Sequence, residues 1–175
     1  MIEAFKSLLD AAPAGPRLEF GVCRGDTLAL MIDHPGETLG IDSFEGMGEP
    51  GPHDASPPGE PSYPKGRLAV PLDFVTARFA GCNEPLPILV RGWIPDVLPT
   101  LPPRAWAFVH IDLDHYAPTL ACLEWVWPRM LPGGIVCCDD WFQDRDYLAG
   151  RAINEWQASH GPFAGTFGRK AYWIL

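Results

Sequence analysis

The sequence predicts an α/β domain built around a mostly parallel β-sheet with helices on both of its faces. Short apolar runs of strand character alternate along the chain with longer segments of helical periodicity, which is the pattern of βα units. The 175 residues fit a single domain over residues 1–175. Hydrophobic residues make up 47% of the chain and charged residues 20%, a composition that is sufficient for one continuous core.

The first part of the chain predicts two helices and two strands in alternation. Apolar spacing separates the two kinds of element, and the pair Pro35 and Gly36 ends the second helix. The expected elements are a helix over residues 1–13, a strand over 16–22, a helix over 25–34 and a strand over 37–44.

A long loop is expected over residues 46–66. This segment contains six Pro and five Gly, a composition that supports neither a helix nor a strand ladder. It follows directly on the C-terminal end of a strand, where open α/β sheets bind their ligands. The sequence therefore leaves two interpretations open, a lid over a binding site and a solvated insertion without a role.

The second half of the chain predicts further βα steps and a terminal strand pair. We expect Pro132, Gly133 and Gly134 to form a sharp turn, and the last two strands to join near Gly168. The expected elements are a helix over 71–80, a strand over 86–93, an irregular crossover over 94–105, a strand over 105–114, a helix over 118–130, a strand over 135–141, a helix over 151–161 and two strands within 162–175.

The charge balance excludes some classes of partner. The chain has 13 Lys and Arg against 22 Asp and Glu, which gives a formal net charge of -9. Nucleic acids and anionic membranes bind through clustered Lys and Arg, so neither is an expected partner. The chain contains no apolar stretch of about 18 residues and no signal-peptide pattern at its start, and we therefore expect a cytoplasmic protein.

A glycine turn and an acidic residue predict a cofactor site at the ends of the first two strands. Gly21 and Gly25 lie four residues apart, which differs from the dinucleotide pattern GxGxxG and favours a smaller cofactor. Asp42 closes the second strand, where an acidic side chain can accept both hydrogens of a ribose diol. The alternatives are a plain strand-to-helix turn for the glycines and a turn-initiating role with Ser43 for Asp42.

Four carboxylates predict a second site. Asp112 and Asp114 end one expected strand, and Asp139 and Asp140 end the next one, so all four should meet at one edge of the sheet. No Lys or Arg lies beside them in the sequence, and their mutual repulsion would require a cation or a shared proton. Oxygen ligands suit Mg²⁺, Ca²⁺ or Mn²⁺. The alternative is that strand-end Asp residues cap the next helix, above all Asp140.

Two histidines and two tryptophans complete the candidate residues. His110 lies in phase with Asp112 along the expected strand, and His115 lies just beyond it, so either could act as a base. A structural role is the alternative for both. Trp93, directly after the third strand, could stack on an adenine, and Trp141 could form a pocket wall.

The sequence resembles the macrocin O-methyltransferase family of class I S-adenosylmethionine-dependent enzymes. The resemblance extends from residue 18 to residue 173 and rests on LEFGVCRGDTL, GIDSFEGM, LVRGWIPDVLP, the segment from VHIDLDHY through PGGIVCCDDW, and the closing AYW. Its most specific part is DxDxY followed by PGG and an Asp pair, with Asp112 and Asp139 27 residues apart.

The resemblance implies a Rossmann-like class I methyltransferase fold with a mostly parallel seven-stranded sheet and an antiparallel C-terminal strand. It implies that S-adenosylmethionine is the cofactor and that a Mg²⁺ ion is held by Asp112, Asp139 and Asp140. Asp112 is the implied base, and His115 is the second candidate. The residues expected to bind the cofactor are Glu19, Gly21, Val22, Gly25, Asp42, Ser43, Phe44, Gly92, Trp93 and Asp112.

The implied reaction is Mg²⁺-dependent methylation of a hydroxyl on a small molecule, such as a sugar or a natural-product glycoside. The alternatives are a DxD-type transferase that binds a nucleotide sugar, an aspartyl-phosphate phosphatase and a non-catalytic cofactor-binding partner subunit. The family is longer at the N-terminus, so the resemblance predicts an acceptor pocket that is open or is completed by another subunit of a homo-oligomer. His115 replaces the apolar residue that the family usually has between the second Asp and the Tyr.

Overall fold

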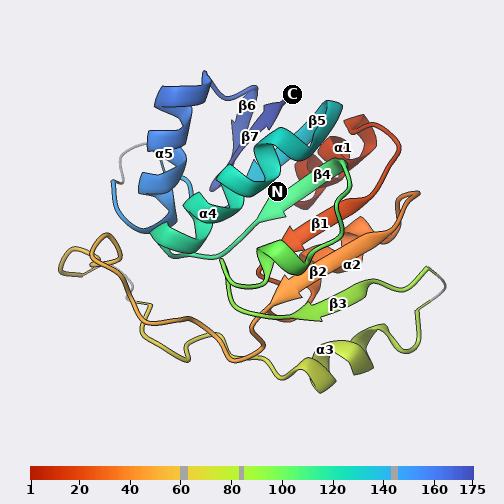
Figure 1. Ribbon diagram of the computed structural model, residues 1–175, viewed down its shortest axis with the longest axis horizontal. Helices are drawn as coiled ribbons and strands as arrows, with labels where there is room; N and C mark the ends of the chain where they lie inside the picture. The colour runs from red at the N-terminus through yellow and green to blue at the C-terminus, as the bar shows by residue number, and fades with distance from the viewer. Residues whose placement is uncertain (60–62, 83–84, 143–145) are drawn as a thin grey trace.

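The computed structural model describes residues 1–59, 63–82, 85–142 and 146–175. It confirms the α/β class: seven strands form one sheet in the order β3-β2-β1-β4-β5-β7-β6 (Figure 1). The strands β3, β2, β1, β4 and β5 are parallel, and β7 is antiparallel to both of its neighbours. The predicted mostly parallel sheet with an antiparallel C-terminal strand is therefore confirmed.

The elements follow the expected order along the chain. The strands are β1 (Arg17–Phe20), β2 (Thr38–Asp42), β3 (Ile88–Arg91), β4 (Trp106–Ile111), β5 (Met130–Cys138), β6 (Gly165–Phe167) and β7 (Lys170–Ile174). The helices are α1 (Ile2–Ala11), α2 (Asp26–Met31), α3 (Leu72–Phe79), α4 (Tyr116–Val126) and α5 (Leu148–His160), with short 3₁₀ turns at Leu98–Thr100 and Trp127–Arg129.

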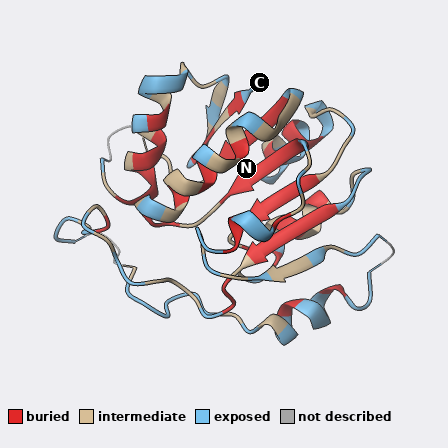
Figure 2. Ribbon diagram, viewed as in Figure 1, coloured by how far each residue is buried: buried red, intermediate tan, exposed pale blue. Residues whose placement is uncertain are grey.

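Helices cover both faces of the sheet. Strands β1 and β4 are buried at every position, as expected for central parallel strands that have helices on both sides (Figure 2). On one face, apolar residues of α4 and α5 pack on the sheet, and on the other face α1 and α2 do so. Alternation along β4 sends Val109 and Ile111 to the first core and Phe108 to the second.

The structure corrects the expected boundaries around β5. Pro132, Gly133 and Gly134 do not form a turn before the strand but lie inside it. Trp106 pairs with Met130 and Phe108 pairs with Ile135, so β5 contains extra residues that form a bulge. Gly133 has a φ of 77° there. The helix before β5 begins at Tyr116 and ends at Val126, because Pro128 belongs to a 3₁₀ turn.

An aromatic cluster joins α5 and β7 to the end of α4. The Trp127 ring lies 5.4 Å from the Trp156 ring and 5.6 Å from the Trp173 ring, both nearly edge to face. His160 stacks on Trp156 with 3.7 Å between ring centroids. These contacts fix the last helix and the last strand against the rest of the core.

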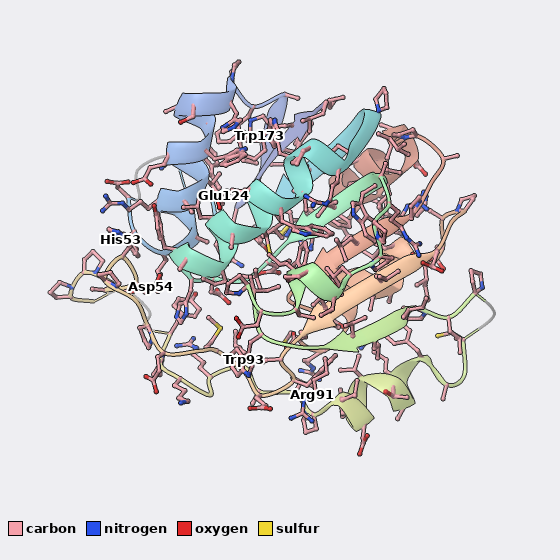
Figure 3. All side chains as sticks on the ribbon, in the orientation of Figure 1. His53, Asp54, Arg91, Trp93, Glu124 and Trp173 are labelled. Atoms are coloured by element: carbon pink, nitrogen blue, oxygen red, sulfur yellow. The ribbon has the colours of Figure 1, made fainter. Side chains whose placement is uncertain are left out.

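The Pro- and Gly-rich segment 46–66 is tied down at several points. At its base, the Met47 N–H donates to the Arg67 carbonyl at 2.8 Å, and the Gly66 N–H donates to the Met47 carbonyl at 2.9 Å. Farther along, the Leu148 N–H donates to the His53 carbonyl at 2.9 Å, and Asp54 lies beside the start of α4 (Figure 3). The segment is therefore not a purely solvated insertion.

Within the described ranges, every helix falls short of the length and apolar character that crossing a membrane would require.

Candidate active site

A cavity of ≈ 650 Å³ lies at the C-terminal ends of the parallel strands. Several residues expected to act on cofactor or substrate line it, namely Gly21, Asp42, Ser43, Gly92, Trp93, Asp112, His115 and Asp140. Other expected residues do not line it: Glu19, Val22, Gly25, Phe44 and Asp139. Asp114, one of the four carboxylates of the predicted cation site, also lines it, and the lining residues to which sequence reasoning gave no individual role include Met47, Tyr63, Arg67 and Arg169.

The glycine turn after β1 depends on the two glycines for different reasons. Gly21 has a φ of +87°, and a Cβ there would lie 1.7 Å from the carbonyl oxygen of Asp112. Gly25 has a φ of +78°, and its Cβ would lie 2.9 Å from the Phe79 ring. The first glycine lets β1 and β4 approach each other at the cavity, and the second lets α2 pack on α3.

Asp42 joins the ends of β1 and β2. Its Oδ2 accepts a hydrogen bond from the Cys23 N–H at 2.9 Å, and its Oδ1 accepts one from the Phe44 N–H at 2.7 Å. The Asp42 carbonyl accepts a third from the Gly92 N–H, which brings the end of β3 to the same place. Asp42 thus combines a structural role in both turns with a position on the cavity wall.

Trp93 forms part of the wall after β3. Its side chain is 37% exposed, and Figure 3 shows it near the end of β3, beside the segment that follows β2. Gly92 precedes Trp93. A larger residue would clash at this position, because a Cβ there would lie 2.6 Å from Val97. A flat aromatic ring at this edge suits stacking on a planar base.

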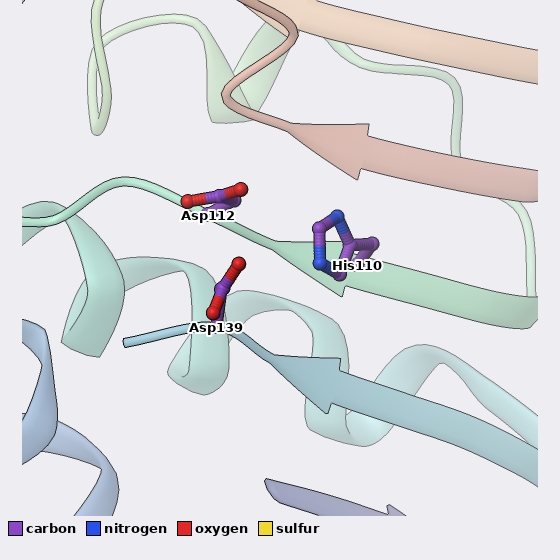
Figure 4. A group of neighbouring side chains, drawn as sticks. All are labelled: His110, Asp112 and Asp139. Atoms are coloured by element: carbon purple, nitrogen blue, oxygen red, sulfur yellow. The ribbon is translucent and has the colours of Figure 1, made fainter. Parts of the chain in front are cut away.

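The acidic residues meet at the ends of β4 and β5, as expected (Figure 4). Their potential ligand atoms form two overlapping groups, each within 4.8 Å, and the groups share Asp112. One consists of His110, Asp112 and Asp139, and the other of Asp112, Asp114 and Asp140. The predicted trio of Asp112, Asp139 and Asp140 is therefore divided between two groups.

The expectation that no basic side chain offsets these carboxylates is wrong. Lys170 Nζ donates to Asp139 Oδ2 at 2.6 Å, and Arg169 Nη1 lies 3.4 Å from Asp140 Oδ1. Lys170 is the first residue of β7, which runs antiparallel beside β5, and Arg169 directly precedes it. The available signal was the Arg-Lys pair directly after Gly168: a terminal strand that pairs antiparallel with β5 begins at the edge where β5 ends.

Burial and mutual repulsion raise the pKa values of three carboxyl groups. The pKa of Asp112 rises to about 8, mainly through burial and then through Asp139 and Asp140. The pKa of Asp114 rises to about 9 through burial and through Asp140, to which it is hydrogen-bonded. Burial also raises the pKa of Asp140. Burial acts on Asp139 in the same direction, but Lys170 outweighs it and holds that pKa below the ordinary value.

These features fit a divalent cation bound by Asp112, Asp114 and Asp140. Three carboxylates within 4.8 Å form the oxygen-rich set that Mg²⁺ prefers, and burial first and mutual repulsion second raise their pKa values, so a bound cation would stabilise their charged forms. Asp139 fits less well as a ligand. Lys170 occupies its Oδ2, and the Asp140 N–H donates to its Oδ1 at 2.8 Å.

His110 belongs to a buried polar chain under the acidic residues. Its Nδ1 lies 3.0 Å from Glu19 Oε1, and its Nε2 lies 3.0 Å from Lys170 Nζ. An ammonium group can only donate, so Nε2 accepts and the Nδ1–H donates to Glu19. Burial, followed by Lys170, lowers the pKa of His110 to about 3, which keeps the ring neutral. This histidine does not line the cavity.

His115 lines the cavity but contacts the 46–66 segment. Its Nε2 lies 2.9 Å from the Tyr63 carbonyl, a contact that requires a proton on Nε2. Its Nδ1 lies 4.0 Å from Asp54 Oδ2, and the side chain is buried. As placed here, the ring connects the start of α4 to this segment.

The chain is similar in sequence and in fold to known methyltransferases. The sequence model of the macrocin-O-methyltransferase (TylF) family matches residues 3–162. The chain is 33% identical over 182 residues to the 8-demethyl-8-(2,3-dimethoxy-alpha-L-rhamnosyl)-tetracenomycin-C 4'-O-methyltransferase of Streptomyces olivaceus, an alignment that covers 95% of this chain and 67% of that one.

Two solved methyltransferase structures share the fold over nearly the whole chain. The calicheamicin methyltransferase CalS11 is 26% identical with a TM-score of 0.72, over 99% of this chain and 77% of that chain. The O-methyltransferase NovP is 22% identical with a TM-score of 0.75, over 99% and 78%. With the family match, these similarities establish that the chain belongs to the macrocin O-methyltransferase family and is an S-adenosylmethionine-dependent O-methyltransferase.

Proposed function

We propose that the protein transfers the methyl group of S-adenosylmethionine to a sugar hydroxyl of a glycosylated natural product in a Mg²⁺-dependent reaction. One observation carries the proposal: Asp112 adjoins both the glycine turn and the other cavity carboxylates. On the first side, a Cβ on Gly21 would lie 1.7 Å from the Asp112 carbonyl oxygen; on the second, potential ligand atoms of Asp112, Asp114 and Asp140 lie within 4.8 Å of one another. A cofactor on the first side and an acceptor on the second would place donor and acceptor atoms next to each other.

The acceptor class is taken from relatives. The Streptomyces olivaceus relative is named for methylating a rhamnosyl-bearing tetracenomycin, and CalS11 is named as a calicheamicin methyltransferase. A sugar offers neighbouring hydroxyls that can approach clustered carboxylates. The cavity also has apolar wall residues such as Met47, Ile94 and Pro118, which suit an aglycone.

The chain's own residues would position the reactants and accept one proton. Methyl transfer breaks the bond between sulfur and methyl carbon, forms a bond between oxygen and that carbon, and releases the hydroxyl proton. A Mg²⁺ ion held by Asp112, Asp114 and Asp140 would lower the pKa of a bound hydroxyl. Asp112 is the proposed base, because it adjoins both the glycine turn and the other carboxylates, so an acceptor hydroxyl bound beside the cofactor would lie within its reach.

The first experiment is a calorimetric titration of S-adenosylhomocysteine into the protein, with Mg²⁺ and with EDTA, followed by methylation assays on rhamnosylated acceptors. We expect micromolar cofactor binding and turnover that EDTA abolishes. The absence of cofactor binding in both conditions would overturn the proposal, and titration of a nucleotide sugar would then test the DxD alternative. Full activity in EDTA would remove the metal from the proposal and leave the methyl transfer.

Substitution of the acidic residues tests their roles separately. Asp112→Asn is expected to abolish turnover and to change the affinity for S-adenosylhomocysteine by only a few-fold. Asp114→Asn is compared with Asp112→Asn in both measurements, because Asp114 also lines the cavity. An Asp112→Asn variant that turns over normally at saturating cofactor would exclude Asp112 as the base. A wild-type protein that binds cofactor but methylates none of the acceptors would favour the non-catalytic alternative.

A further inference from the structure

Tyr63 is an aromatic residue of the 46–66 segment that lines the cavity. The residue is half-buried, and the Arg67 guanidinium lies 4.7 Å from the centre of its ring. Within the described ranges, the Tyr63 hydroxyl forms no hydrogen bond with a protein atom. A phenol hydroxyl can both donate and accept, so a hydroxyl on a cavity wall without a protein partner is suited to bind a ligand.

The charged groups nearest to this hydroxyl include two of the acidic residues. Burial raises the pKa of Tyr63, Asp114 and Asp140 raise it further, and Arg169 acts in the opposite direction. Charge interactions weaken with distance, so the strongest of them identify close neighbours. Tyr63 therefore lies on the side of the cavity where the proposed acceptor binds.

The backbone of Tyr63 is anchored to the start of α4. The His115 Nε2–H donates to the Tyr63 carbonyl at 2.9 Å, and His115 is only 3% exposed. On its other side, His115 Nδ1 lies 4.0 Å from Asp54 Oδ2, and Asp54 accepts from the Tyr116 N–H at 2.7 Å. Asp114 directly precedes His115 in the chain. One buried hydrogen bond thus fixes the position of Tyr63 relative to a carboxylate of the acidic site.

We propose that Tyr63 selects the acceptor sugar: its hydroxyl binds a sugar hydroxyl beside the one that is methylated, and His115 is the positioning residue that holds Tyr63 there. This inference rests on the proposed function and names the group that recognises its sugar. A sugar carries hydroxyls on adjacent carbons, so when one of them approaches the carboxylates, its neighbour can reach the same wall. An acceptor without that neighbour would leave the phenol unpaired, and such a loss discriminates strongly between substrates.

The test is a calorimetric titration of p-nitrophenyl rhamnoside, and of analogues that each lack one ring hydroxyl, into the protein with S-adenosylhomocysteine and Mg²⁺. For one analogue, wild type is expected to bind about 3- to 10-fold more weakly than it binds the parent rhamnoside, as expected for one hydrogen bond. Tyr63→Phe is expected to lose that factor on the parent and to bind the parent and this analogue equally. Its affinity for S-adenosylhomocysteine should not change. Tyr172→Phe is the control with the same chemical change, because Tyr172 lies on β7 and does not line the cavity.

Kinetic measurements test the role of His115. His115→Phe removes the donor to the Tyr63 carbonyl, whereas His115→Gln keeps an N–H in a similar place. His115→Phe is expected to raise KM for the acceptor as Tyr63→Phe does, with kcat within about 3-fold of wild type, and His115→Gln is expected to restore KM. In the Tyr63→Phe background, His115→Phe is expected to add little, because its effect passes through the Tyr63 hydroxyl. A folded His115→Phe that loses kcat and keeps its affinity for the acceptor would overturn this role and favour His115 as the base.

The analogue series decides the role of Tyr63. If Tyr63→Phe discriminates among all the analogues as wild type does, the proposal is wrong. A loss of affinity that persists in Tyr63→Phe belongs to another contact and counts against the proposal for that hydroxyl. If His115→Phe does not fold, the series in Tyr63→Phe decides alone, since this variant keeps the carbonyl that His115 binds.

The same measurements separate this inference from the proposed function. Binding of the rhamnoside that depends on the Tyr63 hydroxyl, but without methylation, would leave the inference standing and remove the proposed function. Methylation that Tyr63→Phe leaves unchanged for every acceptor would remove the inference alone. Neither binding nor methylation of any rhamnoside would remove both.

Discussion

Gly21 shows how one residue can control the geometry of the cavity. Its positive φ and the nearby Asp112 carbonyl are separate obstacles to a side chain at this position. The positive φ imposes a conformational cost that any residue with a side chain would have in the left-handed region. The second is specific to this point, because the end of β4 must lie against the turn for Asp112 to reach the cavity.

Gly21→Ala is expected to destabilise the protein by more than the left-handed conformation alone would cost, which is about 1 to 2 kcal/mol, and to abolish cofactor binding. The matched control is Gly133→Ala, where φ is +77° and a Cβ would meet no atom within 4 Å. Urea unfolding and titration of S-adenosylhomocysteine provide the two measurements. Equal losses of stability in both variants would mean that the Asp112 carbonyl moves aside at little cost.

Asp42→Asn should weaken cofactor binding roughly 10-fold or more, because an amide replaces a charged acceptor whose hydrogen bonds are worth about 1.5 to 3 kcal/mol. The two backbone N–H groups that Asp42 accepts from would also lose part of their bonding. Calorimetry with S-adenosylhomocysteine measures the effect, and Asp73→Asn on the exposed side of α3 is the control. An unchanged affinity would mean that Asp42 organises the turns without touching the cofactor.

At the scale of elements, one carboxylate connects the 46–66 segment to α4. Asp54 is 6% exposed, its Oδ1 accepts from the Tyr116 N–H at 2.7 Å, and its Oδ2 accepts from the Gly51 N–H at 2.7 Å. Tyr116 opens α4, so Asp54 caps this helix from a distant part of the chain. The same segment carries Met47 and Tyr63 to the cavity wall, and Arg67 follows directly after it.

Asp54→Ala is expected to lower the free energy of unfolding by about 1 to 2 kcal/mol, the usual cost of a lost helix cap, and to speed trypsin cleavage after the exposed Lys65 and Arg67, because the segment would open more often. Glu49→Ala is the control in the same segment, since Glu49 forms an exposed ion pair with Lys65. Trypsin digestion followed by mass spectrometry measures the rate of cleavage after Lys65 and Arg67. If the two variants are cleaved at equal rates, Asp54 does not hold the segment in place.

Most elements could be predicted because central parallel strands appear in a sequence as short apolar runs. The segments that became β1, β2 and β4 are of this kind. The bulge at Pro132 could not be predicted, since it depends on the register between β4 and β5. The role of Lys170 was missed for a related reason: only the antiparallel pairing of β7 with β5 brings it to Asp139, 31 residues away in the sequence.

At the scale of the whole molecule, the acidic site opposes the stability of the cation-free fold at neutral pH. The pKa values of Asp112 and Asp114 are about 8 and about 9 in the folded protein, against an ordinary 3.8. These groups hold protons more tightly when folded, so the free energy of unfolding falls as the pH rises towards those values. His110 acts in the opposite direction, but only below its ordinary pKa of 6.5, because its pKa is lowered to about 3.

Between pH 6.5 and about pH 8, the pH dependence of the free energy of unfolding therefore reports on the carboxyl groups and not on His110. In EDTA, the melting temperature is expected to fall across this window, and Asp112→Asn should flatten the slope. Mg²⁺ at about 100 times its Kd should restore roughly 5 to 10 °C at the upper end and less at the lower end, since it must displace protons there. A melting temperature in EDTA that rises with pH across this window would contradict the assignment.

The aromatic cluster at α4, α5 and β7 and the cavity residue Trp93 give the protein two separate optical signals. Trp156 and Trp173 are buried in it, so their short-wavelength emission should persist until α5 and β7 detach from the sheet. Trp93 is far more exposed and lines the cavity, and a base stacked on it should quench its red-shifted emission. Ligand occupancy and global unfolding can thus be followed in one sample without a label. Trp93→Phe would remove only the signal that reports ligand occupancy.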